Sequence, residues 1–267
     1  MSDNRRLPDY EHPPVVAIVA AVQFLPLPQF TMAEAVAVAR EFDTWRVVDV
    51  PAALAPIIEP QPGEPHHETL SLGIGSPPIR LLLEEEDGRW IFQLQQDRLA
   101  IHEQRRGERP SFGNVRPRLE TAAEKVSPAL GRPLLAQDHA PEVVEVTYDN
   151  HIAAKDGGWS SFAELNRVLR IVGEAAGEPP YDTVEQLTLG FSEVLTWDGD
   201  FAGRLRVQAE PAQAGDEGPI LRLRLLSRRF VHGRELGSVL EQCHADIVEG
   251  FTAVTTKQMH EIWGRFQ

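Results

Sequence analysis

The sequence predicts an α+β protein built from two similar halves, each with the order strand, helix, three antiparallel strands, helix. Each half opens with an apolar, β-branched run, and a helix-start signal follows that run. Turn residues between alternating segments then mark a hairpin in each half. We assign the halves to residues 1–135 and 136–267. We expect them to form one curved antiparallel sheet with the helices packed on one face.

The first half begins with the apolar run 15–25, which is typical of a buried strand. Thr31 and Glu34 have the spacing of a capping box, in which each side chain bonds a free backbone N–H, so a helix is expected over 31–42. Five prolines in residues 51–65 predict an extended loop, because proline has no backbone N–H to donate.

A hairpin follows, centred on an Asp-Gly pair at 87–88 that suits a two-residue turn. Such a turn pairs Leu83 with Phe92, so that apolar side chains meet on one face. A third strand is expected over 99–104. Apolar residues at helical spacing then predict a helix that is capped by Asn114 and lies on the sheet.

The second half repeats this order, beginning with a strand over 143–153. Ser161 and Glu164 have the spacing of a second capping box, and the helix that they start is expected to end at Gly173. A longer amphipathic helix is expected over 236–251, near the end of the chain.

The hairpin of the second half is predicted around residues 198–200. A two-residue turn mixes the faces of its strands, whereas a three-residue turn pairs Phe191 with Val207, so we expect a bulged loop. A strand over 220–226 follows. Thr255 and the glutamine three residues later predict a further capping box, which starts a short final helix.

Composition narrows the class of protein. The 267 residues carry a formal net charge of -14, which repels nucleic acid and anionic membranes at long range. The single cysteine, Cys243, excludes an intramolecular disulfide and a zinc site built on thiolates. No apolar run is long enough to span a bilayer, and the first residues lack a signal core. We expect a cytoplasmic protein with no membrane contact and no cofactor. The loop residues 66–68 (His-His-Glu) lack further ligands at metal spacing, so no metal site is predicted.

Five segments carry a resemblance to a known family. They are Pro-Pro-Val-Val leading to Val-Gln-Phe-Leu-Pro over 13–26, Gln-Leu-Gln-Gln-Asp-Arg at 93–98, Arg-Pro-Arg-Leu at 116–119, Glu-Val-Thr-Tyr-Asp-Asn-His-Ile at 145–152, and 254–264, which contains Met-His-Glu-Ile-Trp-Gly. In these segments the chain resembles a sporadically distributed family of uncharacterised bacterial and archaeal proteins. The resemblance spans nearly the whole chain in order. It implies a family but no reaction, and the patchy distribution of that family suggests a link to defence or mobile elements.

Alternation in the predicted strands points to one polar sheet face. Arg204 and Arg206 share one side of their strand, and Arg222 and Arg224 alternate with leucines in the next strand. Guanidinium groups suit the capture of carboxylate or phosphate, so this face is a candidate binding surface. The alternative is a solvated face whose arginines pair with the chain's own carboxylates. The candidate binding residues are Gln93, Gln95, His102, Arg204, Arg206, Arg222 and Arg224.

Other candidates come from the family-like motifs. Tyr148, Asn150 and His151 cluster at the end of a strand, where they either supply acid–base chemistry or pack and hydrogen-bond the strand end. His260 and Trp263 either face a partner or dock the last helix on the core. Cys243 belongs to an apolar stripe, which predicts a buried structural cysteine rather than a catalytic pair with its neighbour His244.

Because no catalytic motif stands out, the leading hypothesis is a non-enzymatic binding or regulatory protein. It engages a protein partner or an anionic small ligand through the polar Arg/Gln face, and a homodimer is a further option. The first alternative is a hydrolase-like enzyme with a pocket formed by Tyr148, Asn150 and His151. The second alternative is a nucleic-acid-binding protein, which the missing exposed aromatic residues disfavour.

Overall fold

The computed structural model describes residues 6–27, 30–49, 52–64, 79–136, 140–172, 188–213 and 218–266. Its strands are β1 (Val15–Phe24), β2 (Trp45–Asp49), β3 (Arg80–Glu85), β4 (Trp90–Gln95), β5 (Arg98–Gln104), β6 (Pro141–Ala153), β7 (Leu189–Trp197), β8 (Asp200–Gln213) and β9 (Pro219–Phe230). Its helices are α1 (Met32–Arg40), α2 (Phe112–Leu130), α3 (Ala154–Gly157), α4 (Leu236–Val254) and α5 (Lys257–Ile262), with a 3-10 helix, η2 (Phe162–Arg167). The part of the chain described is therefore a mixture of helix and strand, as the sequence predicts.

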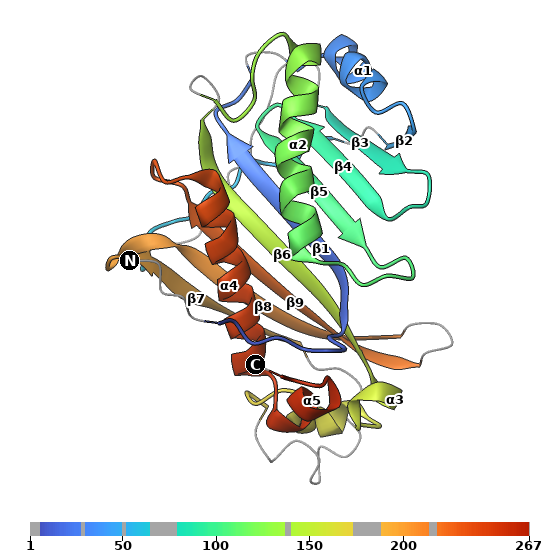
Figure 1. Cartoon of the computed structure of the whole chain (residues 1–267). Coiled ribbons are helices and arrows are strands. Elements are labelled where there is room, and N and C mark those ends of the chain that lie inside the picture. Colours follow the sequence, from blue (N-terminus) through green and yellow to red (C-terminus); the bar gives the residue numbers. More distant parts are fainter. Residues whose placement is uncertain are drawn as a thin grey trace.

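The described strands form one open sheet in the order β2-β3-β4-β5-β1-β6-β9-β8-β7, and every neighbouring pair is antiparallel. The two long helices, α2 and α4, lie across one face of this sheet (Figure 1). Helix α2 covers β1 and β5, and α4 covers β6 and β9. We call the opposite side of the sheet the outer face.

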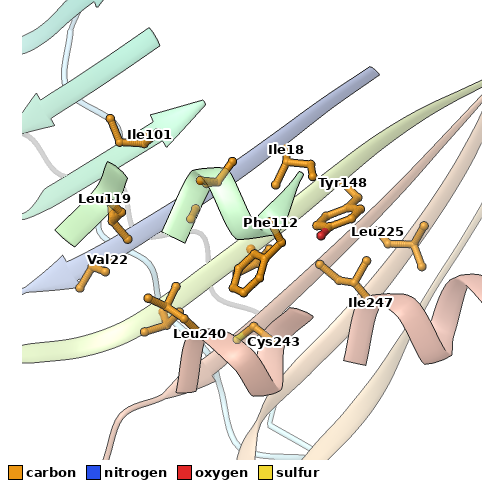
Figure 2. Packing of buried hydrophobic residues seen from close by; sticks show 14 of the residues in the cluster. Ile18, Val22, Ile101, Phe112, Leu119, Tyr148, Leu225, Leu240, Cys243 and Ile247 are labelled. Carbon is orange, nitrogen blue, oxygen red and sulfur yellow. The ribbon is translucent and has the colours of Figure 1, made fainter. Parts of the chain in front are cut away.

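The core lies between the sheet and these two helices. Ile18 and Val22 project from β1 toward α2 because side chains alternate along a strand, and both are buried. Leu119 from α2 and Leu240 from α4 close the same layer (Figure 2). Burial of such side chains stabilises the fold by roughly 1.5–3 kcal/mol each relative to their exposed state.

The predicted hairpin registers are confirmed. Leu83 lies opposite Phe92 in the β3–β4 pair, and Phe191 lies opposite Val207 in the β7–β8 pair. The extra residue of the second hairpin is in β8, at a bulge beside Gly203, rather than in the turn itself. Gly203 is required there, because a Cβ would lie 1.9 Å from the carbonyl oxygen of Arg228 on β9.

The first capping box is confirmed, since Glu34 N–H bonds Thr31 Oγ1 and Thr31 N–H bonds the Glu34 carboxylate. The second is wrong. Ser161 makes no side-chain cap, Glu164 instead accepts bonds from Ser160, and the segment that follows is the short 3-10 helix η2. The predicted helix end at Gly173 lies outside the described residues, as do residues 66–68.

Two further helix starts were predicted at the wrong residue. The helix assigned to an Asn114 cap begins at Phe112, after Ser111. The last helix is capped by Thr256, whose Oγ1 accepts from the Met259 N–H. Thr255 is instead the C-cap residue of α4, where its hydroxyl donates to the Phe251 carbonyl.

The first half also contains a strand that the sequence did not predict. The short β2 pairs with β3 at one edge of the sheet, so four strands rather than three follow α1 in this half. Its Val47 and Val48 are both exposed, so the segment lacks the alternation that identifies a half-buried strand. None of the helices in the described part of the chain combines the length and the apolar character needed to cross a membrane.

Candidate functional site

The outer face of the sheet brings together the seven residues predicted to bind a ligand or partner. Strands β8 and β9 are neighbours, with Arg204 opposite Arg228 and Gln208 opposite Arg224. The leucines and valines that alternate with these arginines are buried toward α4. In the first half, the β4–β5 register puts Gln95 opposite Arg98 on the same outer face.

A segment of the chain itself covers part of this face. Residues 52–64, which we call the strap, belong to the proline-rich loop and contain no helix and no strand beyond an isolated bridge at Ala52. Gln95 bonds the strap through both ends of its amide, since Nε2 donates to the Leu54 carbonyl and Oε1 accepts from the Leu54 N–H, each at 3.0 Å. Arg98 donates to the Ala55 carbonyl at 3.0 Å. Gln95 is therefore buried beneath the strap, and Gln93 is also buried, rather than facing a partner as predicted.

The strap continues across the centre of the sheet. Gln23 of β1 accepts from the Ile57 N–H and donates to the Ile57 carbonyl, at 2.5 and 3.2 Å. These side-chain amides satisfy backbone groups of the strap in the way that another strand would satisfy them. The sequence motif that contains Gln23 thus has a structural role, which is to hold the strap on the outer face.

Glu59, two residues further along the strap, lies among three arginines. Its side chain is 1% exposed. Arg204 Nη1 lies 2.8 Å from Oε2, while Arg206 Nη1 and Arg228 Nη1 lie 2.7 and 2.6 Å from Oε1. We call Arg204, Arg206 and Arg228 the arginine cluster. Burial alone raises the pKa of Glu59, but the bonds from Arg206 and Arg204 and the charge of Arg228 outweigh it and hold this pKa below its ordinary value.

Neighbouring arginines on the outer face are paired to different degrees. Arg224 makes a bidentate contact with Asp149, at 2.7 and 3.2 Å, and remains exposed. Arg228 also bonds Glu145, at 2.9 Å from Nε. Arg222 is exposed and makes no ion pair with the residues that the structure describes. The face is therefore partly neutralised by the chain's own carboxylates, with Arg222 left open to solvent.

His102 lies on the outer face between β1 and β4. Its Nε2 is buried and has no hydrogen-bond partner in the described ranges. Burial, reinforced by the nearby charge of Arg80, lowers the pKa of His102 to about 4. The imidazole is therefore neutral at physiological pH and adds no charge to the face.

The next arginine along β9, Arg229, points to the other side of the sheet. Its guanidinium makes a buried bidentate ion pair with Asp246 of α4, at 2.7 and 2.8 Å, and also donates to the Thr196 carbonyl. The strand predicted over 220–226 is longer in the structure, where β9 continues to Phe230. Alternation along that longer strand assigns Arg228 to the outer face and Arg229 to the helix side.

The predicted Tyr148, Asn150 and His151 pocket does not form as a group of three. Tyr148 and Asn150 line a cavity of about 680 Å³ on the helix side of the sheet. His151 is next in sequence to Asn150 but lines a different cavity, together with Ile152 and Ala153. The Tyr148 hydroxyl instead lies 2.9 Å from Nδ1 of His244, a residue that the sequence analysis did not consider as its partner.

The remaining candidates have mainly structural contacts. Cys243 is buried, and that burial raises the pKa of its thiol to about 12, as expected for a structural cysteine. Trp263 is buried against Tyr10 and Phe251, with ring centroids 6.2 and 5.0 Å away. His260 Nε2 lies 2.9 Å from the Thr255 hydroxyl. These contacts favour docking of the last helix on the core.

The chain was compared with protein-family models and with curated proteins. No protein-family model matches the chain, and no curated protein matches it significantly. The resemblance to the sporadically distributed family stays a prediction. The outer face and the cavity beside Tyr148 are therefore the two candidate functional sites.

Proposed function

We propose that the protein is a non-enzymatic binding or regulatory protein that recognises an acidic segment of a partner protein through the arginine cluster. The observation that supports this most directly is Glu59, a carboxylate held by three guanidinium groups. A site that already binds one carboxylate has the geometry to bind another. Glu59 then acts as an internal occupant of the site, and the strap competes with the partner.

The way the strap is held supports exchange of one carboxylate for another. Beyond the bridge at Ala52, side-chain hydrogen bonds from Gln23, Gln95 and Arg98 and the ion pairs of Glu59 join the strap to the sheet. Each hydrogen bond contributes only about 0.5–1.5 kcal/mol net. Withdrawing Glu59 leaves three partly desolvated guanidiniums, so an incoming carboxylate is favoured over an empty site.

The test is binding of a ten-residue polyglutamate peptide to the Glu59→Gln variant, measured by fluorescence anisotropy at low salt. We expect this variant to bind the peptide at least tenfold more tightly than the unaltered protein, because its internal competitor has lost its charge. Adding Arg204→Gln and Arg206→Gln is expected to abolish the gain. Glu64→Gln is the matched control, because Glu64 is exposed on the same strap and its carboxylate accepts from the Gln61 N–H.

Three results would refute the proposal. One is a folded Glu59→Gln variant that binds no peptide. Another is binding that survives loss of Arg204 and Arg206. The third is retention of single-stranded DNA in preference to the peptide, which would favour the nucleic-acid alternative. If a small carboxylate such as citrate competes as effectively as the peptide, the ligand class is a small anion.

We further propose a cytoplasmic location and a homodimer. The family resemblance adds the proposal of a link to defence or mobile elements. The enzyme alternative retains Tyr148 and Asn150 in one cavity, with His244 in the place expected for His151.

We also propose that the two halves are an internal duplication. From the β1–β6 pair outward, the sheet reads β5-β4-β3-β2 on one side and β9-β8-β7 on the other. Reversed chain order thus recurs on both sides, and in each half the last strand along the chain is followed by a long helix on the same sheet face. This symmetry supports the duplication, with β2 as an addition to the first half.

A further inference from the structure

The cavity beside Tyr148 lies on the helix side of the sheet, away from the arginine cluster. Its walls come from β1 and β6, from the first turn of α2, from α4 and from the N-terminal segment 6–13. That segment is held in position at its far end, since the N–H groups of Glu11 and His12 bond the carbonyls of Gly264 and Trp263. A volume of about 680 Å³ is within the range of small-molecule sites.

Apolar side chains such as Ile18, Phe112 and Ile247 form one part of the wall, and polar or charged side chains, among them Asn150 and His244, form the rest. Phe112 and Tyr148 lie side by side there, close to Ile18 and Ile247 (Figure 2). The ring of His244 stacks on Phe112, with centroids 4.5 Å apart and planes 9° apart. This stack, together with the bond from His244 Nδ1 to the Tyr148 hydroxyl, fixes the orientation of the imidazole.

One nitrogen of this imidazole is left for a ligand. Nδ1 is engaged by Tyr148, whereas Nε2 makes no hydrogen bond within the described residues and is not among their buried unpaired atoms. If the tyrosine hydroxyl donates to Nδ1, then Nε2 carries the proton and donates to the cavity. If Nδ1 carries the proton, then Nε2 accepts. A hydroxyl group on a ligand matches both cases, since it can donate and accept.

The surroundings also select against charge. Burial raises the pKa of Tyr148 and lowers the pKa of His244, so both groups are neutral at physiological pH. Glu241 stands on the cavity wall and its charge acts on both side chains. The charged side chains on the wall balance one another, since Arg6 and Arg109 stand with Asp9 and Glu241, and Arg109 also donates to the carbonyls of Tyr10 and Glu11. A neutral ligand leaves this balance undisturbed, whereas an ionised ligand adds an unpaired charge to it.

We propose that this cavity is a binding site for a small neutral molecule with an apolar, ring-sized body and a hydroxyl group that bonds Nε2 of His244. The site is independent of the arginine cluster, because its walls and the outer face lie on opposite sides of the sheet. The ligand class is therefore that of phenols and compact alcohols, and the residue that selects the hydroxyl is His244.

The test titrates the full chain with p-cresol, toluene and 4-methylbenzoate and follows the His244 ring signals by NMR. These probes have the same ring and methyl group and differ only in the hydroxyl or carboxylate. We expect p-cresol to bind about tenfold more tightly than toluene, which corresponds to one well-formed hydrogen bond. We expect 4-methylbenzoate to bind more weakly than either.

Two variants test the location. Gly113→Leu puts a side chain into the cavity, since a Cβ at Gly113 meets only Ser111 Oγ, at 3.5 Å, and it is expected to abolish binding of both neutral probes. Gly113→Ala is its matched control and should bind as the unaltered protein does. His244→Phe keeps the stack on Phe112 and is expected to reduce the preference for p-cresol over toluene to about one.

The proposal is overturned by equal affinity for p-cresol and toluene in the unaltered protein. Tighter binding of 4-methylbenzoate overturns it as well, because that result requires a cationic site. Binding that persists in Gly113→Leu would put the ligand elsewhere. None of these outcomes depends on Glu59, so they are distinguishable from failure of the arginine-cluster proposal.

Discussion

The carboxylate of Glu59 lies 2.8 Å from a guanidinium nitrogen of Arg204, although 145 residues separate the two in the chain. This contact joins a loop of the first half to a strand of the second. The polar outer face that strand alternation predicts is therefore already occupied by an acidic side chain of the same protein, Glu59.

Loss of the Glu59 charge should destabilise the protein in a pH-dependent way. Glu59→Gln leaves the arginine cluster without its counter-ion, so we expect a cost of about 3 kcal/mol at neutral pH. Because the folded-state pKa of Glu59 is below its unfolded value of about 4.5, its contribution is present above that pH. The contribution is lost as the pH falls through the folded-state pKa.

Urea unfolding of both proteins between pH 3 and pH 7 measures this difference. The gap in unfolding free energy should narrow toward pH 3, while Glu64→Gln should stay within about 0.5 kcal/mol of the unaltered protein throughout. A gap of the same size at pH 3 and pH 7 contradicts the pairing described for Glu59.

The buried ion pair between Arg229 and Asp246 should cost more to break than to replace. Asp246→Leu leaves a buried guanidinium unpaired, for which we expect a loss of about 3–5 kcal/mol. Adding Arg229→Met to this variant should recover much of that loss, and Arg229→Met alone completes the cycle. Chemical denaturation of the single and double variants measures the coupling, and Asp198→Asn, which weakens the exposed pair of Asp198 with Arg234, is the control. An additive cycle would show that the two side chains do not interact.

Substitution of Gly203 should disturb the bulge in β8. A Cβ at this residue lies 1.9 Å from the Arg228 carbonyl oxygen, and its φ of 145° is unfavourable for other residues. We expect Gly203→Ala to lower the melting temperature by several degrees or more. Gly113→Ala, where no such contact occurs, should leave the melting temperature almost unchanged. Equal effects of the two substitutions would rule out the close approach of β8 to β9.

The first two capping motifs should respond differently to alanine. Thr31 caps α1, so Thr31→Ala is expected to cost about 1 kcal/mol. Ser161 makes no cap bond, so Ser161→Ala should cost much less. Thermal or urea unfolding decides between them, and a Ser161→Ala loss as large as that of Thr31→Ala would restore the predicted second capping box.

The sequence predicts this protein best where a pattern is local. Alternation in β3 and β4 sets the pairing of Leu83 with Phe92, since a one-residue slip would expose every apolar side chain of the hairpin. The same rule predicts the pairing of Phe191 with Val207 and the shared face of the strand arginines. Alternation does not reveal β2, because its side chains do not alternate between buried and exposed. The capping-box spacing is misleading at Ser161, because Glu164 bonds the neighbouring Ser160 instead.

By itself the sequence determined the mixed fold class, the hairpin registers and the shared side of the sheet on which Arg204, Arg206, Arg222 and Arg224 lie, because these follow from side-chain periodicity and turn chemistry over a few residues. Only the tertiary structure decided what those side chains meet. Glu59 reaches the arginine cluster, and His244 reaches Tyr148, through contacts between segments about a hundred residues or more apart. No local pattern encodes such contacts, since they depend on how the strap and α4 are packed against opposite faces of one sheet.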